Sequence, residues 1–214
     1  MLRSPVREAV IVADQIRLHY VQWGEEGPPI VCLHGLTANA FNFQALADDL
    51  AADHRVIAYD LRGRGDSEKP ARGYSIPIHA ADLATLLAAL GLERPVLIGH
   101  SFGAWVALYF AARSPDHLNK VVLMEGGVTY PWKTLEDLPA WFSAALNRLG
   151  TPIPSFDAYT QRLKAAPFLG PYWNAYFDLY FQHDVRQQSD GSVVAKCYRQ
   201  GTLEEFSRYA EAAA

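Results

Sequence analysis

The sequence predicts an α/β fold in which a mostly parallel sheet carries helices on both faces. Short apolar runs alternate with stretches of helical periodicity over residues 1–127 of the 214-residue chain. Several of these runs are unbroken, as in strands that are buried on both faces of a parallel sheet. Ligands bind beyond the carboxyl ends of such strands, so the residues that follow each run are the candidates for a site.

The expected strands are apolar runs bounded by turn residues. Apolar and polar side chains alternate from Ile16 to Tyr20, which predicts a strand with one solvated face. The run from Pro29 to Leu33 is unbroken and predicts a strand buried on both faces. The strands expected from these patterns are residues 8–13, 15–23, 29–33, 55–60, 95–98 and 121–124.

Three helices are expected between these strands. The first has apolar residues at positions i, i+3, i+4 and i+7, starting at Phe43. The second covers residues 78–90 and is followed by Gly91, a suitable residue for a helix C-terminus. The third, residues 102–112, is apolar almost all round and is expected to be buried.

The stretch that organises the chain is Gly99-His100-Ser101-Phe102-Gly103. It has the pattern G-x-S-x-G and lies between a strand and a helix, the context that gives the pattern meaning. A serine at the apex of this sharp turn presents its hydroxyl above the sheet, and glycines on either side avoid a collision. The helix that follows directs its N-terminal amides toward the same place.

Composition limits the classes of function. The net charge of −4 argues against a nucleic-acid-binding surface. No apolar run has the length of a membrane span, and the N-terminus lacks the pattern of a signal peptide. The two cysteines, Cys32 and Cys197, make no disulfide framework, so a cytoplasmic location is expected.

The composition changes after Gly127. Aromatic residues crowd residues 130–181, and prolines interrupt them repeatedly. This pattern predicts several short helices and no strands. The expected organisation is therefore a core over residues 1–127 and a helical cap over residues 128–214.

Three motifs together resemble the α/β-hydrolase superfamily, and most closely its small cap-bearing serine hydrolases. They are the turn around Ser101, the pair His34-Gly35, and the loop from Asp60 to Ser67, which contains an Arg-Gly-Asp triplet expected to be structural. The resemblance covers residues 6–127 in order and spacing, and it implies a cap after the sixth strand.

The resemblance also implies roles for individual residues. Ser101 matches the nucleophile, and the backbone amides of Leu36 and Phe102 match the two donors of the oxyanion hole. His34 and Gly35 match the turn that supports the oxyanion loop, where the histidine is a brace and not the catalytic base. Neither a metal nor a cofactor is implied.

The sequence departs from the family pattern at its C-terminal end. The family carries its catalytic histidine after an eighth strand, and neither a seventh strand, an eighth strand nor that histidine is found up to Ala214. The expectation is that these residues are a fragment, which alone would be inactive and prone to associate. If the base lies within them, His183 is the first candidate.

The catalytic acid has two open interpretations. Most family members carry it after the seventh strand, but a minority carry it after the sixth, where Glu125 follows residues 121–124. Glu125 is then either the carboxylate that orients the catalytic histidine or a loop carboxylate near the pocket.

The expected activity of the complete protein is hydrolysis of a carboxylic ester or similar acyl bond of a small apolar substrate, through an acyl-enzyme on Ser101. One alternative is a carbon–carbon bond hydrolase on the same scaffold, and another is a non-catalytic protein that binds a ligand in the same pocket. The similar epoxide hydrolases and haloalkane dehalogenases use an aspartate nucleophile, so Ser101 argues against both.

Overall fold

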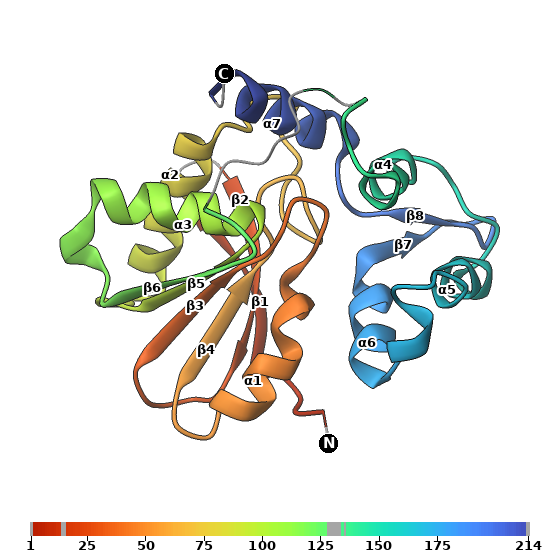
Figure 1. Cartoon of the computed structure of the whole chain (residues 1–214). Helices are drawn as coiled ribbons and strands as arrows, with labels where there is room; N and C mark the ends of the chain where they lie inside the picture. The colour runs from red at the N-terminus through yellow and green to blue at the C-terminus, as the bar shows by residue number, and fades with distance from the viewer. Residues whose placement is uncertain (1, 14–15, 128–133, 135, 213–214) are drawn as a thin grey trace.

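A computed structural model of the chain describes residues 2–13, 16–127, 134 and 136–212. The strands of its larger sheet are β1 (Arg7–Ala13), β2 (Ile16–Trp23), β3 (Pro29–Leu33), β4 (Arg55–Tyr59), β5 (Val96–His100) and β6 (Lys120–Met124). They lie in the order β1-β2-β4-β3-β5-β6 (Figure 1). β1, β2 and β4 pair antiparallel, and β4, β3, β5 and β6 pair parallel. The predicted fold class is confirmed.

Seven α-helices occur in the described residues, and the three expected between the strands are among them. Short 3₁₀ helices are found at η1 (Ala40–Phe43), η2 (Pro115–His117) and η3 (Gly170–Tyr172). The α-helices are α1 (Gln44–Leu50), α2 (Ile76–Ala89), α3 (Phe102–Arg113), α4 (Ala140–Asn147), α5 (Phe156–Lys164), α6 (Ala175–Asp184) and α7 (Arg199–Ala212).

The unbroken apolar runs are explained by two cores, one on each face of the sheet. Val31 and Leu33 of β3 point to the face that α2 and α3 cover. Ile30 and Cys32, the alternate residues of the same strand, point to the face that η1 and α1 cover. A strand with a helix on each face needs apolar side chains at every position, which is why no alternation appears in the sequence.

The prediction that β2 has one solvated face is wrong. Arg17 is exposed, but the next residues of the strand, including His19 and Val21, are buried. Val21 packs in the core beneath η1 and α1, and His19 pairs with a buried carboxylate. The polar side chain of His19 in this alternating pattern is therefore explained by a buried hydrogen bond and not by exposure to solvent.

The C-terminal segment consists mostly of short helices, as expected, but it also contains two strands. β7 (Val185–Gln187) and β8 (Val193–Ala195) form an antiparallel hairpin beside α5 and α6 (Figure 1). The prediction of no strands is wrong here, because the hairpin needs only three residues a side around the turn at Gly191, which has a φ of 84°. The predicted start of the cap, residue 128, lies outside the described residues.

Helix α7 returns from this segment to the first part of the chain (Figure 1). Ahead of it, the amide of Tyr198 donates to the Gly63 carbonyl at 2.7 Å. Within it, Glu204 accepts from the amides of Gly73 and Tyr74. These contacts hold α7 against the loop that follows β4.

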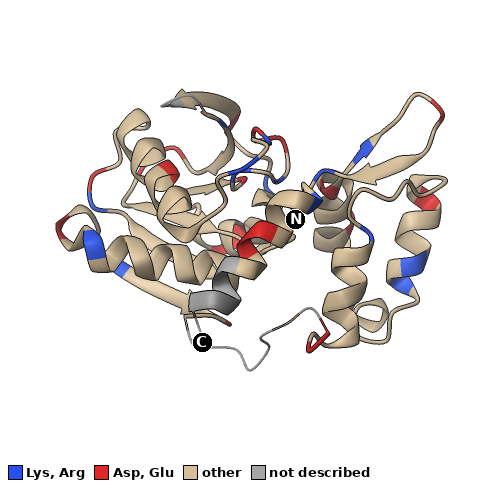
Figure 2. Cartoon of the chain, turned by 90° about the horizontal axis from the view of Figure 1, so that it is seen from above, with Lys and Arg blue, Asp and Glu red and all other residues tan. Residues whose placement is uncertain are grey.

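The charge distribution agrees with the small net charge. Acidic and basic residues are interspersed along the described chain (Figure 2). None of the described helices combines the length and apolar character that a bilayer span requires.

Candidate active site

Ser101 lies at the apex of the turn between β5 and α3. Its backbone has a φ of 51° and a ψ of −115°, a left-handed conformation that residues other than glycine rarely adopt. A Cβ on Gly99 would lie 2.4 Å from the Gly103 carbonyl oxygen, and one on Gly103 would lie 2.1 Å from that of Leu33. The structure thus supplies the steric reason for both glycines of the motif.

The loop after β3 lies directly against this turn. A Cβ on Gly35 would approach the Nδ1 of His100 to 3.2 Å and the Cβ of Ser101 to 3.3 Å. Leu36 and Phe102, the two predicted amide donors, line the same cavity as Ser101. The residues predicted to surround an oxyanion are therefore brought together, although they are 66 positions apart in the chain.

His34 is fully buried and uses both ring nitrogens. Its Nδ1–H donates to the Gly35 carbonyl at 2.8 Å, and its Nε2 accepts from the Leu61 amide at 3.0 Å. Burial lowers the pKa of His34 to about 4, so the imidazole is neutral. These contacts tie His34 to the loop after β3 and to the start of the loop after β4.

The cavity beside Ser101 has a volume of about 490 Å³. Its walls come from the loop after β3, the turn at Ser101 and the predicted cap, and they are mainly apolar. The aromatic residues that line it are Phe102, Trp105, Trp141, Phe142, Phe168, Tyr180 and Phe206. Such a lining, mainly apolar and aromatic with a few polar groups, is typical of small-molecule binding pockets.

Glu125 follows β6 and also lines the cavity. Its backbone φ is 51°, and its side chain is 70% exposed. One carboxylate oxygen lies 3.4 Å from the Nε2 of His100. Both interpretations of Glu125 from the sequence agree with this position at the cavity.

No histidine of the described chain, which includes all seven, forms a hydrogen bond with the Ser101 hydroxyl. His183, the first candidate from the sequence, stacks on Phe41 with ring centroids 3.6 Å apart and does not line the cavity. Burial lowers the pKa of His183. It is therefore a packing residue between α6 and η1.

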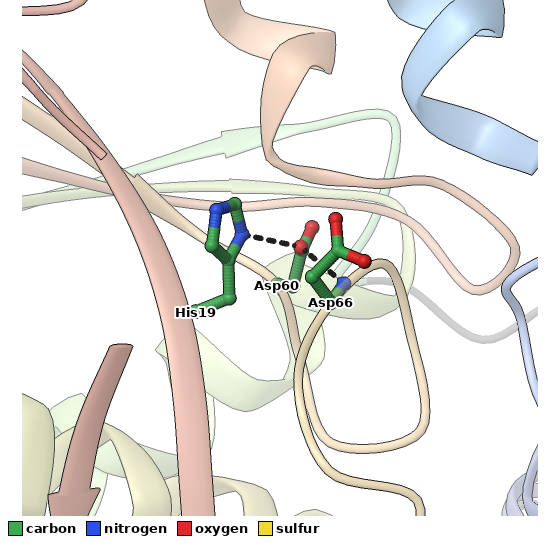
Figure 3. A group of neighbouring side chains, drawn as sticks. All are labelled: His19, Asp60 and Asp66. Carbon is green, nitrogen blue, oxygen red and sulfur yellow. Dashed lines mark hydrogen bonds and ion pairs between the residues drawn. The ribbon is translucent and has the colours of Figure 1, made fainter. Parts of the chain in front are cut away.

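A second cluster, His19, Asp60 and Asp66, was not found from the sequence (Figure 3). His19 Nδ1 lies 2.7 Å from Asp60 Oδ2, which also accepts from the Asp66 amide at 2.9 Å, and Asp60 Oδ1 accepts from the Ala40 amide at 2.8 Å. Burial alone would raise the pKa of Asp60, but the hydrogen bond and charge of His19 outweigh it and lower the pKa to about 2.

These contacts use both carboxylate oxygens of Asp60, and Asp66 forms an ion pair with Lys196. The cluster therefore braces the loop after β4. The Asp60 oxygens and one oxygen of Asp66, which could otherwise bind a metal ion, already bind other groups of the protein. Asp60 thus holds this loop through the amides that its carboxylate accepts. Arg62 does the same by a different route, because it pairs with Asp82 of α2.

A third cluster was also missed. Arg64, Glu205 and His79 are fully buried, and their side chains meet between the loop after β4, α7 and α2. Arg64 donates to the Leu36 carbonyl at 2.9 Å as well as to Glu205. The Arg-Gly-Asp triplet that begins at Arg64 is thus structural, as expected, but the partner lies 141 positions away and no local pattern marks it.

Comparison with known proteins agrees with this geometry. The family described as alpha/beta hydrolase fold matches residues 28–205, and the chain belongs to this family. Several relatives carry hydrolytic or related activities in their names.

A non-heme chloroperoxidase of Streptomyces lividans is 36% identical over 160 residues, which are 73% of this chain and 54% of that protein. A 3-hydroxybutyrate-oligomer hydrolase of Cupriavidus necator is 31% identical over 159 residues, 70% of this chain and 52% of that protein. The chain thus spans about half the length of these curated relatives. The structure of E-2-(acetamidomethylene)succinate hydrolase superposes with a TM-score of 0.80 at 24% identity, over 96% of this chain and 73% of that one, a likeness of fold.

Proposed function

We propose that the complete protein is a serine hydrolase that cleaves a carboxylic ester or similar acyl bond of a small apolar substrate. The observation that carries this proposal is the backbone of Ser101, held in a left-handed conformation at the wall of an aromatic cavity. Strained residues persist where the surrounding structure enforces them, and they are concentrated at functional sites.

In the proposed reaction, the Ser101 hydroxyl oxygen attacks the substrate carbonyl and its proton passes to a base. The negative charge that develops on the carbonyl oxygen is stabilised by the amides of Leu36 and Phe102. The second amide begins α3, so the positive end of the helix dipole adds to it. The leaving group departs, and water then cleaves the acyl-enzyme.

The base is a histidine in this proposal. Because none of the seven histidines is bonded to Ser101, we assign the role to another part of the complete protein. Glu125, at the cavity wall after β6, is proposed as the carboxylate that orients this histidine. The alternative for Glu125 is a carboxylate at the cavity rim without a catalytic role.

The apolar substrate follows from the cavity walls. Burial of one methylene group is worth about 0.8 kcal/mol, so aromatic walls favour longer acyl chains.

The two cysteines, Cys32 and Cys197, are buried free thiols, which supports the proposed cytoplasmic location.

The test is labelling of the complete protein with a fluorophosphonate probe. We expect labelling in the wild type and in Ser189→Ala, an exposed control position, and none in Ser101→Ala. Labelling that persists in Ser101→Ala would place the nucleophile elsewhere.

In the same series, Glu125→Gln should lower kcat by about 10³- to 10⁴-fold if Glu125 orients the histidine. A loss below about tenfold assigns Glu125 to the rim.

A ligand-binding protein without catalytic activity is the second candidate. The observation that favours it is that no histidine of the described residues forms a hydrogen bond with the Ser101 hydroxyl. A complete protein that binds an apolar ester without turnover, and that the probe does not label, would support this candidate.

A further inference from the structure

The loop that carries the Leu36 amide is held through its carbonyl groups. The Leu36 N–H belongs to the same peptide as the Gly35 carbonyl, which accepts from His34 at 2.8 Å. The next carbonyl, that of Leu36, accepts from the Nε–H of Arg64 at 2.9 Å. Hydrogen bonds on two successive carbonyls fix the rotation of the Leu36 backbone and hence the direction of its N–H.

Arg64 is itself held by two other elements. Its Nη1–H donates to the Arg62 carbonyl at 2.9 Å and to Glu205 Oε1 at 2.6 Å, and its Nη2 pairs with the other oxygen of Glu205. His79 of α2 lies against the same Glu205 carboxylate. The side chains of Arg64, Glu205 and His79 have no exposed surface.

This arrangement links α7 to the loop after β3. Glu205 belongs to α7 and lines the cavity, and Arg64 bonds both Glu205 and the Leu36 carbonyl. The planar guanidinium presents donors in a fixed fork, so its orientation toward Leu36 depends on the carboxylate that holds the other end. A displacement of α7 would therefore change the position of Arg64 and, through it, the orientation of the Leu36 carbonyl.

We propose that Arg64 and Glu205 are positioning residues for the oxyanion hole, through which the docking of α7 sets the direction of the Leu36 amide. This inference rests on the proposed function, because it assigns the Leu36 amide to the oxyanion. Neither residue touches the reacting atoms. Their contribution is made in the transition state, where charge develops on the carbonyl oxygen.

Arg64→Lys and Glu205→Gln in the complete protein test the proposal. Arg62→Lys is the matched control, because the Arg62 side chain pairs with buried Asp82 and makes no hydrogen bond to the loop after β3. Arg64 bonds only the backbone carbonyl of Arg62, which this substitution keeps. A lysine keeps the charge of Arg64 but cannot bond Glu205 and the Leu36 carbonyl together. We expect kcat to fall by about tenfold to a hundredfold in both test variants, with KM within about threefold of wild type.

A second measurement does not depend on activity. Hydrogen exchange of the peptide that covers residues 34–40 should become about threefold faster or more in Arg64→Lys and Glu205→Gln, and should not change in Arg62→Lys. A general loss of stability would instead accelerate exchange in every variant. If Arg64→Lys does not fold, Glu205→Gln decides the question, since it keeps the side-chain volume.

The outcomes separate the two proposals. A wild type that the fluorophosphonate does not label overturns the proposed function, and exchange of residues 34–40 still decides whether Arg64 and Glu205 position the loop. A wild type that is labelled, together with test variants whose kcat and exchange match those of Arg62→Lys, overturns the positioning role alone.

Discussion

At the scale of single residues, the two nitrogens of His34 have different tasks. Nδ1 carries the proton that bonds Gly35, and Nε2 accepts from the Leu61 amide. A second proton would place an N–H of the ring against the N–H of Leu61 and break that bond. The fold therefore requires the neutral form, in agreement with the pKa of about 4 that burial gives His34.

This requirement predicts a loss of stability in mild acid. The unfolded chain protonates His34 near pH 6.5, whereas the folded chain does so only near its pKa of about 4. The stability that neutral His34 gives the folded chain is therefore complete above pH 6.5 and is lost as the pH falls from 6.5 to 4. We expect His34 to remove about 2 kcal/mol of unfolding free energy between pH 7 and pH 5.

Urea unfolding at pH 7 and pH 5 measures this effect. His34→Asn keeps a donor and an acceptor but does not titrate, so the difference between the two pH values should shrink by about the same amount. His117→Asn, at an exposed position, controls for the removal of a histidine. An unchanged pH difference in His34→Asn would show that other groups cause the acid sensitivity.

At the scale of elements, the junction of β5 and α3 depends on contact between backbones. The Cβ that an alanine would add at Gly103 falls 2.1 Å from the Leu33 carbonyl oxygen of β3, so α3 would have to move away from the sheet. The same movement would carry Ser101 and the Phe102 amide with it. A change in the packing of α3 against the sheet would therefore also change the geometry of the site.

Gly103→Ala should therefore destabilise the protein by about 3 kcal/mol or more, because a rigid backbone group must shift. Gly91→Ala is the matched comparison. Gly91 has a φ of 60° but nothing within 4 Å of the added Cβ, so only the left-handed conformation is penalised, at about 1 kcal/mol. Thermal unfolding of both variants measures the difference, and equal losses would contradict the steric argument.

At the scale of the whole molecule, β6 forms an apolar edge of the described sheet. Val122, Leu123 and Met124 are exposed by 43%, 40% and 43%, and Leu108 of the neighbouring α3 by 37%. An edge strand presents unpaired backbone groups, and apolar side chains beside them favour pairing with another chain. The opposite edge strand, β1, also exposes apolar side chains, since Val10 and Val12 are exposed by 41% and 75%.

We expect the 214-residue chain to associate at micromolar concentration through β6. Size-exclusion chromatography with light scattering should show species larger than a monomer for the wild type and for the exposed control Ala84→Lys in α2. Leu123→Lys should restore the monomer, because a charge on an edge strand opposes pairing. A monomeric wild type would contradict the prediction. Association that is lost in Val12→Lys and kept in Leu123→Lys would place the contact at β1.

The sequence by itself determined the architecture of the first part of the chain. Apolar runs and turn residues predicted each strand of the larger sheet to within a few residues, and the G-x-S-x-G pattern predicted the turn at Ser101. These features are local, because periodicity and glycine requirements follow from neighbouring residues. The neighbourhood of Ser101, Leu36 and Phe102 was implied by family resemblance.

Only the tertiary structure decided which polar residues meet. His19 was expected on a solvated face and instead bonds Asp60, and Arg64 bonds Glu205 from the far end of the chain. No periodicity records such partners, because a buried ion pair depends on which elements pack together and not on spacing within one element. The link from α7 through Arg64 to the Leu36 carbonyl is visible for the same reason only in the folded chain.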